Sequence, residues 1–276
     1  MRDRPPSSCS GAGRARRGSS RRGEFTGIAR PGHCQWRTSP WGHDGARRQE
    51  RCAGRTRWAR GGEGRGGGRA APGGPVAYEG EGLEPDGDYD GVRFEGADLA
   101  DEVGRGARFM DCELRGCGLD RADLGRARFM DSVLTGVRGV GTDLAEASLR
   151  DVEIVDARLG GVQLHGAVLE RVLVRGGKID YLNLRTARLK DVVFEGCVLS
   201  EPDFGQAQMT RVEFRDCVVR RADFTQTRMD GVDLRAVTEL DIARGVDRLA
   251  GAVISPVQLM ELAPAFAAQI GVRVEA

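Results

Sequence analysis

Residues 94–254 carry a large apolar side chain at almost every fifth position, and this period fits neither regular secondary structure. The series has 33 positions, which we call rungs; 29 are apolar, and only Gly104, Gly139, Glu239 and Arg244 interrupt it. A helix repeats its apolar face every 3.6 residues and a strand every 2.0. A five-residue unit cannot bury its own side chain, so it has to stack on copies of itself. The period therefore predicts a repeat structure with a shared interior.

A second period of twenty residues indicates how the units stack. The sequence GARFMD at 106–111 returns as RARFMD at 126–131. Steps of twenty also give columns of like residues two positions before a rung, such as Val152, Val172, Val192, Val212 and Val232. Four units thus make one coil with four sides, in which each side chain packs on its equivalents above and below. At the usual strand spacing of about 4.8 Å per coil, we expect an all-β solenoid of about eight coils over 94–254.

The unit itself resembles a known family. ADL at 97–99, ADL at 122–124 and ADF at 222–224 are similar to the repeats of pentapeptide-repeat proteins. This resemblance implies a right-handed quadrilateral β-helix over residues 94–254, and it implies little about activity.

Residues 1–75 differ from the rest of the chain in charge and pattern. They contain 17 arginines, no lysine and five acidic residues, a net charge of +12, whereas residues 76–276 carry 25 basic and 36 acidic residues, a net charge of −11. The first segment is rich in Gly, Ser and Pro and has no apolar periodicity, so it buries too little apolar surface to offset the entropy of ordering it. We expect a disordered Arg/Gly-rich tail over 1–75.

Three interpretations of this tail remain open. Its arginines, with Trp36, Trp41 and Trp58, suit phosphate contacts and base stacking in nucleic acid. The composition also suits a solvated tail without a partner. The third interpretation is a start codon placed too far upstream, because forty arginines against two lysines indicate a GC-rich coding sequence. We expect nucleic acid as a partner only through this tail.

Residues 76–93 are predicted to form an acidic, Gly-rich linker that leads into an irregular first coil. Beyond it, Gly104 and Gly139 leave two rungs without a side chain, and Val103 and Val140 stand beside them. The simplest expectation is a local shift that turns these valines inward. The alternative is a bulge that shapes a binding face.

The residues that point outward from the repeat are the candidates for binding a partner. The residue before each rung on one side of the coil forms an acidic column, whose candidate binding residues are Asp123, Asp143, Asp203 and Asp223. On the next side, arginines and aspartates alternate, which is typical of a solvated, self-paired surface. The corresponding function is a non-catalytic scaffold for protein–protein interaction, with a partner that the sequence does not name.

The second function class is DNA mimicry. The chain resembles the loop-free quinolone-resistance branch of the family, which implies a DNA-mimicking inhibitor of DNA gyrase or topoisomerase that contributes to quinolone resistance. A rod of eight coils would rise about 38 Å, close to the roughly 34–36 Å of one B-DNA turn. Residues 76–236 hold 31 acidic and 22 basic residues, a net charge of −9, which is well below the charge of the same length of duplex.

Residues 255–276 are predicted to form a helical cap. Ser255 is a good N-cap, Pro256 suits the first helical position, and Gln258 completes a capping box. We expect Pro264 to divide the segment into two short helices, Gly271 to end the second, and residues 272–274 to add a short strand. The spacing puts an apolar face on this cap, formed by Leu259, Leu262, Phe266 and Ile270. That face would shield the open end of the solenoid, or form a homodimer interface, as the resemblance implies.

The sequence gives no sign of catalysis, a cofactor or a metal. It has no Walker loop and no GxGxxG after a strand, and His165 is the only histidine in residues 76–276. Cys112, Cys117, Cys197 and Cys217 occupy small inward positions and are expected to be reduced core residues; the other cysteines, in the tail, lack zinc spacing. No run reaches the eighteen apolar residues of a membrane span. We expect a cytoplasmic protein without a membrane partner.

Overall fold

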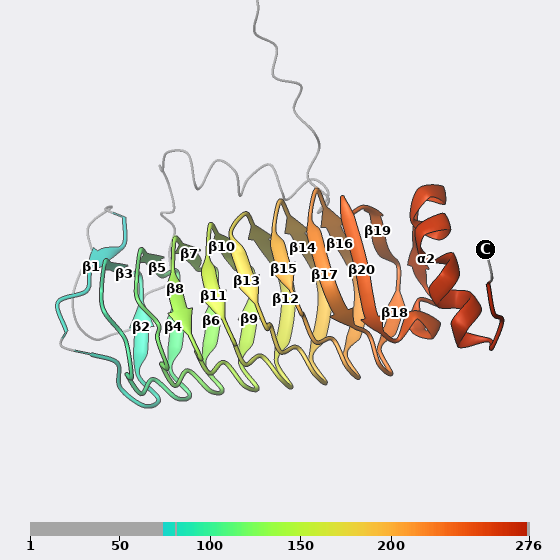
Figure 1. The fold of residues 1–276 in the computed structure, drawn as a ribbon. Helices are drawn as coiled ribbons and strands as arrows, with labels where there is room; N and C mark the ends of the chain where they lie inside the picture. The colour runs from blue at the N-terminus through green and yellow to red at the C-terminus, as the bar shows by residue number, and fades with distance from the viewer. Residues whose placement is uncertain (1–73, 81, 275–276) are drawn as a thin grey trace, which may run out of the picture. The chain divides into compact units, whose positions relative to one another are not determined.

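The computed structural model describes residues 74–80 and 82–274, so the predictions for the tail lie almost entirely outside it. The described part is an all-β solenoid of about nine coils that ends in one helix, α2 (Pro256–Gln269), as Figure 1 shows. This architecture confirms the predicted four-sided β-solenoid with a helical cap. No helix in residues 74–80 and 82–274 is long and apolar enough to cross a membrane.

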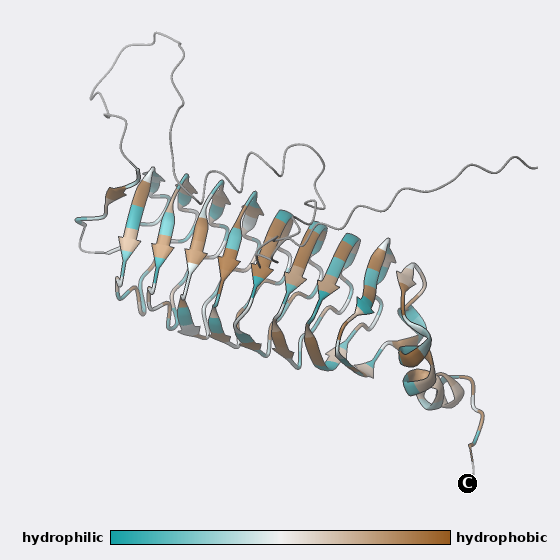
Figure 2. Cartoon of the chain, turned by 90° about the horizontal axis from the view of Figure 1, so that it is seen from above, coloured by the Kyte–Doolittle hydropathy of each residue, from teal (hydrophilic) through white to brown (hydrophobic). Residues whose placement is uncertain are grey.

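Short parallel strands build three sides of the coil (Figure 2), and each strand pairs with the one about twenty residues away. The first side consists of β2 (Asp88–Asp90), β4 (Arg108–Met110), β6 (Arg128–Met130), β9 (Ser148–Arg150) and β18 (Arg228–Asp230). The second consists of β1 (Val76–Ala77), β3 (Val92–Glu95), β5 (Glu113–Arg115), β7 (Val133–Thr135), β10 (Glu153–Val155), β19 (Val232–Ala236) and β21 (Ala252–Val253). Three longer strands turn the corner between these two sides, namely β12 (Val168–Arg175), β14 (Arg188–Glu195) and β16 (Gln208–Arg215).

The third side forms a separate six-stranded sheet. Its strands are β8 (Arg138–Val140), β11 (Arg158–Gly160), β13 (Lys178–Asp180), β15 (Val198–Ser200), β17 (Val218–Asp223) and β20 (Glu239–Arg244). The fourth side has turns instead of regular strands, joined coil to coil by single parallel bridges from Val103–Asp123 to Asp203–Asp223.

The corners of the coil explain why the repeat has five residues. Every fifth residue from Asp86 to Gly231 has a positive φ, whether or not it is glycine. A left-handed residue bends the chain onto the next side of the coil, so each five-residue unit gives one side and one corner. L-residues adopt this conformation at a cost of about 1–2 kcal/mol, and glycine and aspartate are common at these corners.

Stacked columns fill the interior as predicted. Rung side chains such as Phe94, Phe109 and Leu199 are fully buried. Equivalent aromatic rings stack along the axis, with 4.5 Å between the centroids of Phe109 and Phe129 and 4.9 Å between those of Phe194 and Phe214. Most residues two positions before a rung are also buried, and Ser132, Thr142 and Thr227 among them donate to a rung carbonyl 23 residues earlier, as Thr227 Oγ1 does to Phe204 O at 2.7 Å.

The prediction that valines turn inward at the two glycine rungs is wrong. Val103 and Val140 remain 47% and 65% exposed. At Gly104 the space is taken by Leu83, whose Cδ1 lies 3.1 Å from where a Cβ would stand. The backbone N–H of Leu83 donates to Glu102 Oε2 at 3.0 Å, which holds Leu83 in this position. We call Leu83 the plug of the Gly104 rung. At Gly139 the atoms nearest to where a Cβ would stand are Thr142 Oγ1, at 2.7 Å, and the Leu119 carbonyl group, at 2.9 Å.

The C-terminal end departs from the register and then closes the solenoid. Pairing between β17 and β20 is irregular, and Leu240 rather than Glu239 lies opposite Val219. The predicted capping box at Ser255 and Gln258 is confirmed. Gly271 ends the helix as predicted, with a φ of 77° and an N–H bond to Ala268 O at 3.1 Å.

Two predictions for this end are wrong. Pro264 lies inside one continuous helix and does not divide it. Proline has no backbone N–H, so the helix lacks the hydrogen bond from residue 264 to Met260 O. Met260 is 75% exposed, so water can bind that carbonyl and the helix continues. Residues 272–274 form no strand: Val272 donates its N–H to Ala267 O of the helix at 2.8 Å, and Val272 and Val274 are exposed.

Candidate functional surfaces

The four predicted acidic residues lie in line on the fourth side of the coil. Consecutive parallel bridges join Asp123, Asp143, Gln163, Asn183, Asp203 and Asp223. We call these six residues the acidic column. The side chains of its four aspartates are only partly exposed, from 15% for Asp223 to 36% for Asp143. The structure therefore brings the predicted residues together on one surface.

Each aspartate of the column also holds its own turn. Asp123 Oδ1 accepts the Gly125 N–H at 3.0 Å, and Asp143 Oδ1 accepts the Ala145 N–H at 2.8 Å. Asp203 and Asp223 make the same bond to the residue two positions on. Asn183 does so through its amide oxygen at 3.1 Å, which shows that the turn requires the oxygen and not the charge.

Arginines neutralise part of the column. Arg105 Nε donates to Asp123 Oδ2 at 3.1 Å, and this bond raises the pKa of the Arg105 guanidinium. Arg185 Nη1 lies 3.2 Å from Asp203 Oδ2, and Arg244 Nη1 lies 3.5 Å from Asp223 Oδ2. In the middle of the column, the Asn183 amide donates to Gln163 Oε1 at 2.7 Å. The column is thus a mixed polar ladder rather than an unbroken row of carboxylates.

Ion pairs between neighbouring coils cover the other sides. Arg108 pairs with Asp88 at 2.8 Å, Arg126 with Glu146 at 2.8 Å, and Arg171 with Asp151 at 2.8 Å, each across twenty residues. Hydrogen bonding from Arg121 lowers the pKa of the Asp101 carboxyl, and hydrogen bonding from Lys190 lowers that of Glu170. Exposed pairs of this kind contribute little each, but they leave the surface electrically self-paired.

The net charge of the solenoid is concentrated at one end. Residues 103–236 contain 21 acidic and 21 basic residues, so the long middle part is neutral. Residues 76–102 contain ten acidic residues and one basic residue. The net charge of −9 predicted for residues 76–236 therefore lies entirely in the first coil and the segment before it.

The helical cap divides the four predicted residues into two pairs. Leu262 is 6% exposed, and Phe266 packs partly buried against the interior, so these two close the solenoid. Leu259 and Ile270 face outward and are 51% and 78% exposed. Sequence reasoning missed the role of Gln258, whose Nε2 donates to Leu234 O at 2.8 Å and to Val237 O at 3.2 Å.

A shallow apolar cleft lies beside α2. It has a volume of about 450 Å³ and is lined by residues of α2 and of the segment before it, which includes the short 3₁₀ helix η2 (Val246–Arg248); among them are Leu249, Ile254, Phe266 and Ile270. The side chains of Val257 and Met260 on the same helix are also exposed, 66% and 75%. We call this surface, defined by Val257, Leu259, Met260 and Ile270, the cap surface.

Titratable groups inside the solenoid do not form a reactive site. Cys112, Cys117, Cys197 and Cys217 are buried and free. Burial raises the pKa of the Cys112 thiol to about 11, and a hydrogen bond with Cys217 raises that of Cys197. Low-pKa, accessible thiolates are the reactive ones, so these thiols fit a packing role. Among residues 74–80 and 82–274, no three metal-ligating side chains gather; the cysteines of the tail lie outside this range.

Two family models match the repeat. One, for a pentapeptide repeat region, matches residues 107–184, and another, for pentapeptide repeats in nine copies, matches residues 184–238. Residues 107–238 of the chain are therefore a pentapeptide-repeat region. The matched range, residues 107–238, overlaps most of the coils with regular corners, which begin earlier, at Asp86, and end at Gly231.

Solved structures of HetL, a pentapeptide-repeat protein, and of QnrB1 are similar to this chain. HetL from Nostoc sp. strain PCC 7120, which is involved in heterocyst differentiation regulation, is 18% identical, with 62% of this chain and 90% of HetL covered and a TM-score of 0.30. Full-length QnrB1, a plasmid-mediated fluoroquinolone resistance protein, is 16% identical, with 69% of this chain and 97% of QnrB1 covered and a TM-score of 0.33. No curated protein matches the chain significantly.

Proposed function

We propose that this pentapeptide-repeat protein is a non-catalytic scaffold for protein–protein interaction that assembles through its cap surface. The observation that carries this proposal is the contrast between a neutral, ion-paired rod and an uncovered apolar end. Residues 103–236 have equal numbers of acidic and basic residues, whereas Met260 and Ile270 are 75% and 78% exposed. Contiguous exposed apolar side chains mark interaction surfaces.

A second copy of the chain is the occupant that we propose for the cap surface. A helix at the end of a solenoid can pack on its equivalent about a two-fold axis, which buries the same residues of both copies. The cleft beside Ile270 could receive an apolar side chain from the cap surface of the second copy. The two pairs found in the cap then have separate roles, Leu262 and Phe266 in closing the solenoid and Leu259 and Ile270 in assembly.

Light scattering on the eluting full chain tests this assembly. We expect a dimer for the native protein and a monomer for the Met260→Glu/Ile270→Glu double variant, with the thermal unfolding of the solenoid unchanged because both side chains face solvent. Glu261→Gln, at an exposed polar position of the same helix, is the matched control and should remain dimeric. A native protein that is monomeric at all concentrations would refute the assembly.

Catalysis has little support in the described geometry. Substrate pockets usually enclose about 300–1,000 Å³ with a few convergent polar groups. The interior cavity of this solenoid has a volume of about 50 Å³ and an apolar lining. The cleft at the cap is larger but is lined almost wholly by apolar side chains. A scaffold function follows more directly from these surfaces than a reaction.

DNA mimicry directed at DNA gyrase is the second candidate function, and the alignment of the acidic column favours it. Asp123, Asp143, Asp203 and Asp223 lie on one side and in register, as a row of phosphates would. The neutral charge balance of residues 103–236 and the arginines beside the column weigh against it. For this reason we rank it below the scaffold.

The structure also dictates how gyrase inhibition should be tested. Reversing the charge of the column would break the turns that its oxygens hold, so the four aspartates should be changed to asparagine, which Asn183 shows to be compatible. If the mimic is correct, the native protein inhibits supercoiling and the asparagine variant does not. Neutralising four exposed acids on other sides, Asp90, Glu95, Asp216 and Asp230, is the control that should retain inhibition. A native protein without effect on supercoiling would eliminate this candidate.

A further inference from the structure

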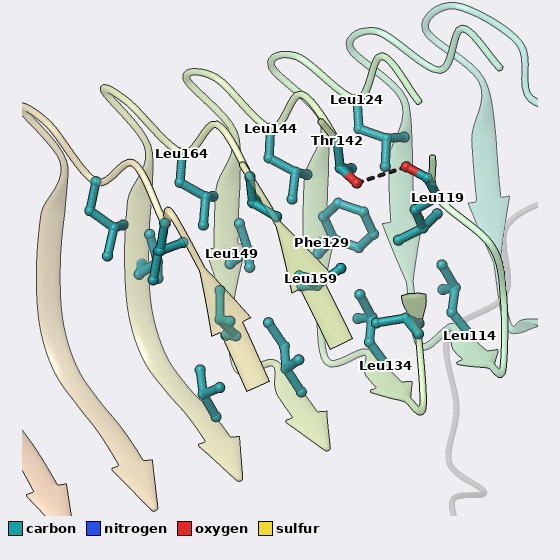
Figure 3. A pocket seen from close by; sticks show the side chains of 18 of the residues that line it. Leu114, Leu119, Leu124, Phe129, Leu134, Thr142, Leu144, Leu149, Leu159 and Leu164 are labelled. Atoms are coloured by element: carbon teal, nitrogen blue, oxygen red, sulfur yellow. Dashed lines mark hydrogen bonds between the residues drawn. The ribbon is translucent and has the colours of Figure 1, made fainter. Parts of the chain in front are cut away.

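The solenoid contains an interior cavity, shown in Figure 3, whose lining includes Leu119 and Leu159, the rungs before and after Gly139 in the same column. Its volume is about 50 Å³, and every residue that lines it occupies a rung or a small inward position, from Leu114 to Phe194. Leu144 and Leu159 point inward in Figure 3, and these two residues and Ile154 line the cavity and are only partly buried. The lining side chains thus come from several adjacent coils and face the interior.

Gly139 contributes no side chain to this space, and none could be added at that position without moving its neighbours. A Cβ on Gly139 would lie 2.7 Å from Thr142 Oγ1 and 2.9 Å from the Leu119 carbonyl oxygen. The register places Leu159 directly opposite Gly139 in the next coil. Leu159 packs against backbone on that side instead of against another leucine.

The chemistry of the lining excludes stable water. Thr142 supplies the single polar side chain, and its hydroxyl donates to Leu119 O at 2.7 Å (Figure 3). Within residues 74–80 and 82–274, no buried side-chain nitrogen or oxygen lacks a hydrogen-bond partner. A buried water needs two to four polar partners, and cavities lined by leucine, isoleucine and phenylalanine stay dry.

We infer that this cavity is a binding site for one small, uncharged, apolar molecule about the size of a xenon atom. A cavity of about 150 Å³ with such a lining takes up benzene or xenon, so a volume of about 50 Å³ selects the smaller of these ligands. Dispersion contacts with the surrounding methyl groups supply the binding energy, since the lining loses those contacts while it is empty. Charged and hydrogen-bonding molecules are rejected because the site offers them no partner.

Methyl-detected NMR of the full chain under xenon pressure tests this site. We expect saturable shifts in the methyl resonances of Leu144, Ile154 and Leu159. Leu189 and Leu199, buried in closely packed columns, serve as controls within the same molecule and should not shift. Leu159→Phe, which places a larger side chain opposite Gly139, should abolish the xenon shifts.

A second variant keeps the test decisive if Leu159→Phe does not fold. Leu159→Ala enlarges the same space toward the size that accepts benzene. We expect benzene to shift the Leu144 and Ile154 methyl resonances in Leu159→Ala but not in the native protein. If xenon leaves the native methyl resonances unchanged and benzene leaves those of Leu159→Ala unchanged, the inference is wrong. Xenon shifts of equal size in folded Leu159→Phe would contradict it as well.

Discussion

Gly104 and Gly139 are the same defect in the repeat, but the protein resolves them differently. Gly104 lies near the start of the solenoid, where the chain before the first regular coil turns back and inserts Leu83 into the empty rung. Gly139 lies in the middle, where the coils on both sides are complete and no free segment is available. There, a cavity of about 50 Å³ remains.

The difference shows what a solenoid can and cannot repair. Each coil contacts only its neighbours, so a missing side chain in the middle can be compensated only by adjacent coils, whose side chains are fixed by their own register. An end has chain outside the repeat that can act as a plug. The helix α2 does the same at the other end, where Gln258 and Leu262 are buried.

The largest effect should follow from placing a charge in the interior next to the unfilled rung. Leu164→Asp buries a carboxylate without a partner, which costs several kcal/mol out of a net stability of about 5–15 kcal/mol, so cooperative unfolding should be lost. Gln163→Asp, one residue earlier and outward, should be nearly neutral because aspartate holds the same turn at Asp143. Circular dichroism with chemical denaturation measures both, and equal tolerance would refute the register.

Removing the plug should make the two glycine rungs alike. We expect Leu83→Ala to lower the free energy of unfolding by about 2–4 kcal/mol, as for other buried leucines whose space does not collapse. Val140→Ser, at the exposed valine beside the unfilled rung, should change it by less than about 0.5 kcal/mol. A larger cost for Val140→Ser than for Leu83→Ala in denaturant titration would mean that valine, and not leucine, fills a rung.

Introducing glycine at a corner should stabilise the protein, whereas removing one from a corner should destabilise it. Thr186 has a φ of 58° and is exposed, so Thr186→Gly should stabilise the protein by about 1 kcal/mol by relieving left-handed strain. Gly136→Ala, at a corner with open space around it, should destabilise it by a similar amount. Thermal unfolding distinguishes the two, and changes of the same sign would contradict the role of the corners.

The smallest effect concerns the hydroxyl beside the void. Thr142 and Thr227 make equivalent bonds of 2.7 Å to rung carbonyls. Thr227→Val should cost about 1 kcal/mol for the lost bond. In Thr142→Val the new methyl group enters the apolar cavity and offsets part of this loss, so the cost should be about half as large. Equal costs in matched denaturant titrations would indicate that the cavity is already filled.

The interior could be predicted from the sequence because it follows from a pattern within each five-residue unit. One large side chain every five residues and one small side chain two positions earlier are enough to specify the columns, the side on which Asp123 lies and the buried cysteines. The positive φ at every corner was not foreseen. Its signal is present, since glycine or aspartate stands at most corners, but arginine, tyrosine and threonine at others hide it.

The way in which the protein accommodates breaks in the repeat could not be predicted from the sequence, because it depends on packing between segments that follow no period. Leu83 belongs to a stretch without a repeat, and only its contact with Gly104 reveals its role. Pro264 was expected to end a helix, but the solvent exposure that makes it tolerable is a tertiary property. The acidic column was aligned correctly, whereas its bonds to Gly125 and Ala145 and its arginine neighbours depend on side-chain geometry.

Residue-resolved NMR under hydrostatic pressure tests the contrast between the two glycine rungs most directly. Pressure favours states that eliminate internal voids, so it should act first where space is unfilled. We predict that native amide signals weaken first in residues 139–164, while those around Gly104 persist to higher pressure. Loss that begins around Gly104, or spreads uniformly along the solenoid, would contradict the account that one defect is filled and the other is not.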